Sequence, residues 1–323
     1  VALHASAALM QPLVDGLGAG ANCAATRLLS LHLALHARTD PDRARSWLAC
    51  VSQLPRLRSL SLDYAAPLRL LAIVNTALKT MGDWTPPDRE ELGGGLRAIT
   101  VHGCHGVNDE AICAMSVVCP RLEQLRIFPD SWREIGDVTD VAVSELHRKL
   151  PRLRVVALGS QTELLLDAGV LVLPRPPAWR SLSLFAPLGD CACVTVSKLA
   201  CLQHLWLGPH KLMQRGIGAS SSISDAGLCI LARTCPLLLD LTIVSLCVTD
   251  AGGAAVLRGC RELRRLRLGG RGVTETMLAE LKNVTQPRLE RLTLWFSGVS
   301  AKGAKQAEVD MPWTHFDVEV VDL

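Results

Sequence analysis

The chain has 323 residues, of which 49% are hydrophobic and only 4% aromatic, and its formal net charge is +3. The apolar content is mainly leucine, alanine and valine, which favours a core built from many small, similar layers. So mild a charge does not predict a nucleic-acid or membrane partner, because dedicated phosphate binders usually concentrate far more positive charge, and we expect neither kind of partner.

Targeting and membrane segments are not indicated by the sequence. The start of the chain has no basic segment followed by an apolar one, and no uninterrupted apolar run reaches the roughly 18 residues of a membrane span. We therefore expect a soluble protein inside the cell, in the cytoplasm or nucleus.

Residues 1–25 are expected to form a partial repeat or cap. Leu9, Leu13 and Leu17 follow one another at a spacing of four, which is typical of the returning segment of an incomplete repeat. The remaining residues, 26–323, are predicted to form one continuous repeat domain.

A Leu-x-x-Leu-x-Leu pattern or a close variant recurs eleven times from residue 28 onward. Most copies begin 23 to 31 residues apart, but two intervals are longer and indicate insertions at 82–95 and 209–222. The first residues of the copies are Leu28, Leu57, Leu96, Leu122, Leu153, Trp179, Leu202, Leu238, Leu263, Leu289 and Trp313.

Each copy of the pattern predicts a short strand with one buried and one outward face. In the copy that starts at Leu263, Leu266 and Leu268 would point inward, whereas Arg265 and Arg267 would point outward. Because the same strand recurs in each unit, the pattern predicts a parallel β-ladder.

A helix is predicted in the second half of most units. Six units share an apolar residue followed by Asn, Ser or Thr and usually an acid, which suits a helix N-terminus because the side chain caps free N–H groups and the carboxylate meets the positive end of the dipole. The six segments are Val107–Asp109, Val138–Asp140, Ile223–Asp225, Val248–Asp250, Val273–Glu275 and Val299–Ala301.

Cysteines are expected to be core residues. Cys119, Cys235 and Cys260 each stand three residues before a strand pattern, where other units have leucine. A thiol that exchanges with leucine behaves as a small buried hydrophobe.

The sequence resembles the cysteine-containing leucine-rich repeats of F-box proteins, which are of the ribonuclease-inhibitor-like type. The residues that carry the resemblance are Cys119–Leu125, Cys235–Leu238 and the stretch from Leu238 to Leu268. The resemblance implies an α/β solenoid, or horseshoe, of about eleven repeats, with a parallel β-ladder on its concave face and helices on its convex face. No F-box is recognisable in this chain.

Catalytic and cofactor motifs are not recognisable in the sequence. Cys191, Cys193 and Cys201 form the one cysteine cluster, but their spacing matches no zinc site. His102 and Cys104 could be interpreted as a Cys/His catalytic pair, but a turn after a strand explains these residues better. We expect a protein that is not an enzyme and that binds no metal or cofactor.

The outward side chains of the ladder are the candidate binding site for a protein partner. Arginine and aromatic residues often dominate interface energetics, although the aromatic ones here could instead pack on neighbouring strands or under an inserted loop. The candidate residues are Arg126, Phe128, Phe185, His204, Trp206, Arg265, Arg267, Arg291 and Trp295.

Two functions remain open at the level of sequence, both non-catalytic. The resemblance implies a scaffold that binds its partner on the concave face, as the substrate-recognition part of an F-box-type ubiquitin-ligase receptor, with the adaptor bound through a segment outside this chain. The alternative is a structural subunit of a large ciliary, axonemal or organellar assembly.

Overall fold

The computed structural model divides the chain into two compact units, Val1–Gln161 and Thr162–Leu323. Each unit is described below by itself. The structure describes residues 2–6, 28–35, 54, 56–64, 95–102, 107–128, 138–159, 178–209, 221–283, 289–295, 297–312 and 314–319.

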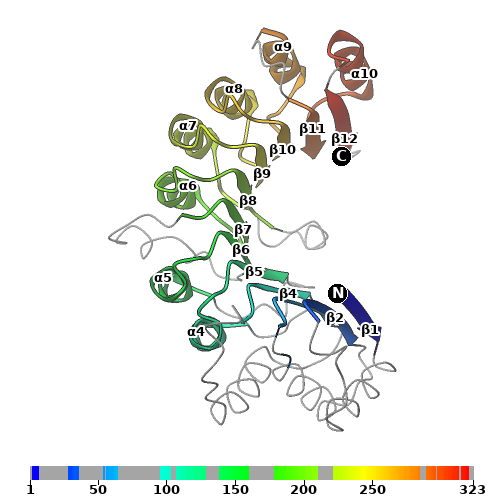
Figure 1. The fold of residues 1–323 in the computed structure, drawn as a ribbon. Coiled ribbons are helices and arrows are strands. Elements are labelled where there is room, and N and C mark those ends of the chain that lie inside the picture. Colours follow the sequence, from blue (N-terminus) through cyan, green and yellow to red (C-terminus); the bar gives the residue numbers. More distant parts are fainter. Residues whose placement is uncertain are drawn as a thin grey trace. The chain divides into compact units, whose positions relative to one another are not determined.

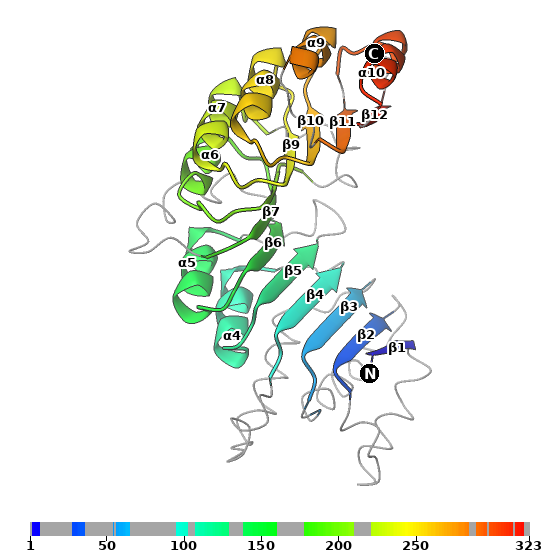
Figure 2. The same cartoon turned by 45° about the horizontal axis from the view of Figure 1, so that its top comes forward.

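The first unit is a ladder of parallel strands with helices on one side (Figure 2). Neighbours along the chain pair in register, so that Leu60 lies beside Leu31 and Ile99. The strands are β1 (Ala2–Ser6), β2 (Ser30–Leu35), β3 (Ser59–Tyr64), β4 (Ala98–His102), β5 (Gln124–Phe128) and β6 (Val155–Gly159). The helices are α4 (Asp109–Val118) and α5 (Asp140–Lys149).

The second unit continues the same alternation of strand and helix (Figure 1). Its strands are β7 (Ser181–Phe185), β8 (His204–Leu207), β9 (Asp240–Val244), β10 (Arg265–Gly269), β11 (Arg291–Trp295) and β12 (His315–Glu319). Its helices are α6 (Asp190–Val196), α7 (Asp225–Thr234), α8 (Asp250–Gly259), α9 (Glu275–Asn283) and α10 (Ala301–Asp310).

The core lies between the strands and the helices, as the strand pattern predicts. In β8 to β11 the inward leucines and isoleucine are completely or almost completely buried, including Leu205, Leu241, Leu266 and Leu292. Each such side chain stabilises the fold by roughly 1.5–3 kcal/mol relative to full exposure. The α/β leucine-rich-repeat solenoid is therefore confirmed.

The predicted helix starts are also confirmed. Asn108, Thr139, Ser224, Thr249 and Ser300 are the N-cap residues of their helices, and each side chain accepts a hydrogen bond from a backbone N–H of the first turn. The sequence pattern missed the start of α6, because its N-cap is Gly189, which has no side chain to signal a cap.

The acids of four capping segments, Asp109, Asp225, Asp250 and Glu275, have a second role that links consecutive repeats. Asp225 accepts hydrogen bonds from the backbone N–H of Thr249 at 2.9 Å and from its hydroxyl at 2.6 Å. Asp250 does the same for Thr274, at 2.7 and 2.6 Å. A carboxylate on one helix thus orients the N-cap of the next, so that the caps of neighbouring repeats are coupled.

The cysteines are buried where the sequence predicts. Cys119, Cys235 and Cys260 are the C-cap residues of α4, α7 and α8. The thiol of Cys260 also donates to the backbone carbonyl of Cys235 at 3.8 Å, and that of Cys235 donates to the carbonyl of Val196 at 3.9 Å. Cysteine therefore differs from leucine at this position, since it also makes a weak bond to the preceding repeat.

Strand β1 lies in the segment 1–25, for which we expect a partial repeat. Leu9, Leu13 and Leu17 lie outside the described residues, as do Cys104, Trp313 and nearly all of the insertions expected at 82–95 and 209–222.

Candidate functional site

The candidate site is the face of the strands that points away from the helices, which we call the helix-free face. In the second unit its strand-start positions are in register and form one row across six strands, which we call the entry row. The entry row consists of Ser181, His204, Asp240, Arg265, Arg291 and His315.

In the first unit, Arg126 and Phe128 occupy neighbouring outward positions of β5, and both are partly exposed. The ring of Phe128 stacks on that of His102, with centroids 4.7 Å apart and planes at 15°. Arg126 donates to the side-chain oxygen of Gln124 at 2.7 Å, and partial burial lowers the pKa of its guanidinium. These two candidates therefore share one patch with His102.

An aromatic cluster in the second unit joins three of the candidate residues. The rings of Phe185 and Trp206 meet edge to face at a centroid distance of 5.8 Å. The rings of Trp206 and Trp295 are 6.5 Å apart, although β9 and β10 separate their strands. We refer to Phe185, Trp206 and Trp295 as the aromatic cluster.

Two of these residues pack against side chains of other strands, which is the alternative that the sequence left open for the aromatic residues. Phe185 and Trp295 are each only 2% exposed, although their register positions face away from the helices. Gly269 is the neighbour of Trp295 in register on β10 and offers no side chain, so the indole can extend toward Trp206. Aromatic rings bury large areas when they pack together, and the cluster is accordingly a second small core.

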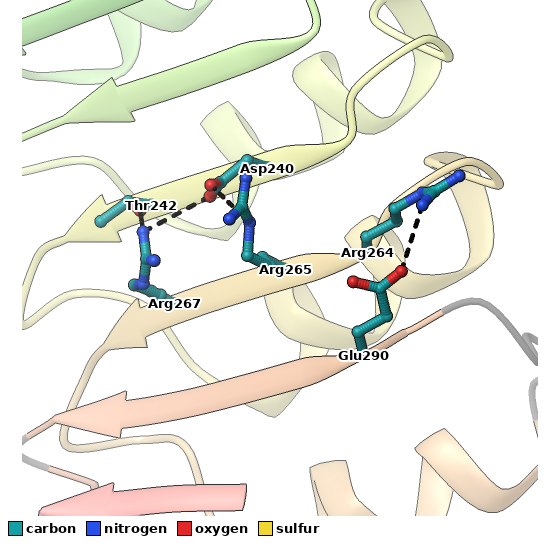
Figure 3. A network of polar contacts seen from close by, with 6 residues as sticks. All are labelled: Asp240, Thr242, Arg264, Arg265, Arg267 and Glu290. Carbon is teal, nitrogen blue, oxygen red and sulfur yellow. Dashed lines mark hydrogen bonds and ion pairs between the residues drawn. The ribbon is translucent and has the colours of Figure 1, made fainter. Parts of the chain in front are cut away.

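The arginines of β10 converge on one carboxylate of β9 (Figure 3). The Nε of Arg265 lies 2.9 Å from Asp240 Oδ2, and an Nη of Arg267 lies 3.5 Å from Asp240 Oδ1. The same Nη of Arg267 donates to the hydroxyl of Thr242 at 3.3 Å. Asp240 is thus held between two guanidinium groups, and its side chain is only 15% exposed.

Arg291 and His204 complete the set of candidates. Arg291 is exposed beside Arg265, and His204 is partly exposed beside Asp240. Sequence reasoning missed His315 as a member of this surface, although the register that places Arg265 and Arg291 also places His315. Phe185, Trp206 and Trp295 are brought together by the structure, and so are Arg265, Arg267 and Arg291.

Among the residues that the structure describes, no group of three or more His, Cys, Asp or Glu side chains is arranged to hold a metal ion. Cys191 and Cys201 are exposed, whereas burial raises the pKa of the Cys193 thiol to about 12. No helix within the described ranges is long and apolar enough to cross a membrane.

The comparisons with known proteins support the fold alone. The sequence matches no protein-family model and no curated protein. The structure is similar to that of Rad7 in its yeast complex with Elc1, with a TM-score of 0.56 and 16% identity over 94% of this chain and 77% of that chain.

Two further solved structures align less well. TLR13 in its complex with ssRNA13 has a TM-score of 0.46 and 14% identity over 90% of this chain and 40% of that chain. A leucine-rich-repeat protein of Leptospira interrogans has a TM-score of 0.36 and 14% identity over 90% of this chain and 84% of that chain. At these identities the likeness to Rad7 describes a shared solenoid architecture.

Proposed function

We propose that the chain is a non-catalytic scaffold inside the cell that binds a protein partner on its helix-free face. The observation that carries this proposal is the entry row, in which six consecutive strands present one side chain each at the same level. Parallel strands lie about 4.8 Å apart, so such a row is a continuous surface rather than a set of isolated residues.

The helices bury the opposite side of the strands. On the helix-free face Thr242, Thr293 and Trp295 are buried as well, whereas the side chains of the entry row are partly or fully exposed and are available to a partner. Arginine and aromatic residues are enriched where binding energy concentrates in protein interfaces. The exposed arginines of the entry row therefore support recognition of a protein by this face.

Photo-crosslinking tests the proposal. A benzoylphenylalanine at His204 samples the helix-free face, and one at Val309, which is 75% exposed on α10, samples the helix side as a matched control. We expect the full-length protein in native extract to form a discrete crosslink with one protein through position 204 and not through position 309. Identical crosslinks at both positions, or none at position 204, would refute the proposal.

We propose a finer role as the substrate-recognition part of an F-box-type ubiquitin-ligase receptor. It is supported by the resemblance carried by Cys119–Leu125 and Leu238–Leu268, and by the fold shared with Rad7 in its complex with Elc1. Affinity purification of the full-length protein should recover a ligase adaptor and a cullin. Recovery of a stoichiometric set of structural subunits without them would instead favour the subunit of a large assembly.

A further inference from the structure

The entry row carries two arginines and a histidine on its last three strands. Arg265, Arg291 and His315 follow one another in register on β10, β11 and β12, and all three are exposed. Asp240 precedes them on β9. Over its last four positions the entry row therefore passes from one carboxylate to two arginines and a histidine.

The Asp240 contact shows how this surface holds a carboxylate. The acid lies on one strand, and the guanidinium groups of Arg265 and Arg267 reach it from the next strand (Figure 3). An ion pair across adjacent strands is the arrangement expected for side chains that face each other in register. The same arrangement is available between β10 and β11, where Arg265 and Arg291 face each other.

Between β10 and β11, the guanidinium groups of Arg265 and Arg291 have N–H donors that could bind another carboxylate. Arg265 contacts Asp240 through Nε, so its two terminal nitrogens are not used in that contact. A guanidinium has five N–H donors in a fixed fork, which favours a second, bidentate carboxylate. The backbone N–H of Arg291 donates to the carbonyl of Arg264 at 3.0 Å, whereas its guanidinium makes no hydrogen bond or ion pair with any residue that the structure describes.

Neighbouring acids do not neutralise Arg291. Glu290 pairs with Arg264 at 3.2 Å, as Figure 3 shows. Asp317 lies on β12 in register with Thr293, one outward position further along the strand than Arg291. Within the described part of the chain, Asp317 forms no ion pair with Arg291.

We propose that Arg265 and Arg291, together with His315, bind an acidic segment of the protein partner. This inference rests on the proposed function, because it names the chemistry of the partner at the same face. A partner carboxylate would lie between β10 and β11 as Asp240 lies between β9 and β10. Because the exposed Arg265 and Arg291 are positively charged, the partner segment that binds them is expected to be negatively charged.

The length of the row favours a peptide over a small anion. Arg265 and His315 are two strand spacings apart, or roughly 10 Å. A single carboxylate or phosphate group is small compared with such a row, whereas neighbouring acidic residues of one chain can occupy its whole length. We therefore assign the site to a run of Asp or Glu residues.

A fluorescently labelled octaglutamate peptide tests the assignment against an octaglutamine peptide in titrations with the full-length protein. We expect the acidic peptide alone to bind, with an affinity that falls as sodium chloride is raised. Arg291→Gln should weaken it roughly fivefold, the effect of an exposed charge pair. The control is Arg271→Gln, which removes another exposed arginine from the turn after β10 and should leave the affinity unchanged.

A gain of affinity provides a test that misfolding cannot imitate. Asp240→Asn removes the internal carboxylate that competes for Arg265 and should strengthen octaglutamate binding by roughly threefold. Equal affinity of wild type, Arg291→Gln and Asp240→Asn would overturn the inference. Displacement of the peptide by millimolar inorganic phosphate would also overturn it, in favour of a small-anion site.

Crosslinking of the native partner distinguishes two outcomes: that this inference is wrong, or that the proposed function is wrong. If the protein crosslinked through position 204 is recovered equally with wild type and Arg291→Gln, the helix-free face binds its partner without the acidic segment, and only this inference fails. If no partner is crosslinked through position 204, the proposed function fails, while the octaglutamate titration still decides whether the acidic site exists.

Discussion

The carboxylate of Asp190 accepts two hydrogen bonds from Ser224, one from its backbone N–H at 2.8 Å and one from its hydroxyl at 2.6 Å. Ser224 in turn caps α7, the next helix of the second unit. Equivalent pairs join Asp109 to Thr139 and Asp250 to Thr274. The capping motif therefore both starts a helix and fastens it to the preceding one.

Loss of the Asp190 carboxylate should destabilise the second unit. Hydrogen bonds to a charged group contribute about 1.5–3 kcal/mol, so Asp190→Ala should lower the free energy of unfolding by an amount in this range. The measurement is urea unfolding followed by circular dichroism, with Glu308→Ala on the exposed surface of α10 as the control. Equal urea midpoints for the two variants would contradict the coupling of the caps.

The Glu275 pair should make part of the stability depend on pH. The backbone N–H of Ser300 donates to Glu275 at 2.8 Å and, with the Ser300 hydroxyl, lowers the pKa of the carboxyl below its usual 4.5. A lowered pKa in the folded state stabilises the fold above pH 4.5, and this contribution is lost as the pH falls through the folded value.

Glu275→Gln should consequently lower the melting temperature at pH 7 and have progressively less effect below pH 4.5. The difference is small because the carboxyl is largely exposed, and we expect less than about 1 kcal/mol. A thermal-shift series against pH measures it, with Glu308→Gln as the reference. A difference that stays constant down to the acid limit would contradict the assignment.

Trp295 should matter for stability, in contrast to the expectation for an exposed interface residue. Its ring is buried in the aromatic cluster, so Trp295→Ala should cost about 3 kcal/mol. Arg291→Ala on the same strand is the matched control and should leave the melting temperature nearly unchanged. Similar melting temperatures for both variants would show that the cluster is not a core.

Gly208 should not tolerate a side chain. Its φ is +114°, and an added Cβ would lie 2.6 Å from the carbonyl oxygen of Val244. Gly208→Ala should therefore destabilise the second unit by about 1–3 kcal/mol. At Gly298 the nearest atom to an added Cβ is 3.5 Å away, so Gly298→Ala is the control in the same denaturation experiment.

The cysteines should divide into two classes of reactivity. Burial raises the pKa of Cys119, Cys193 and Cys260 to about 12, and little thiolate is present in the native protein at pH 8. Brief treatment with iodoacetamide should modify exposed Cys191, Cys201, Cys229 and Cys247 and spare the buried thiols until urea is added. Mass spectrometry of the peptides reads out both classes, and early modification of Cys260 would contradict its burial.

Much of the fold was readable from local sequence. The spacing of leucines in the segment Leu263–Leu268 sets which side chains are buried, and the hydroxyl and acid of Val248–Asp250 mark the start of a helix. Both signals act over a few residues, and each repeat contacts mainly its neighbours. Strands therefore follow all eleven copies of the pattern, whereas α6 was missed because Gly189 carries no capping side chain.

The candidate site could not be predicted in full without the tertiary structure. The sequence alone determined that Phe185 and Trp295 face away from the helices, because alternation along a strand is local. Only the register across β8 to β11 decided that these rings are buried with Trp206, and that Asp240 pairs with two arginines while Arg291 stays exposed. Exposure and charge pairing depend on side chains that are far apart in the chain, and local periodicity carries no information about them.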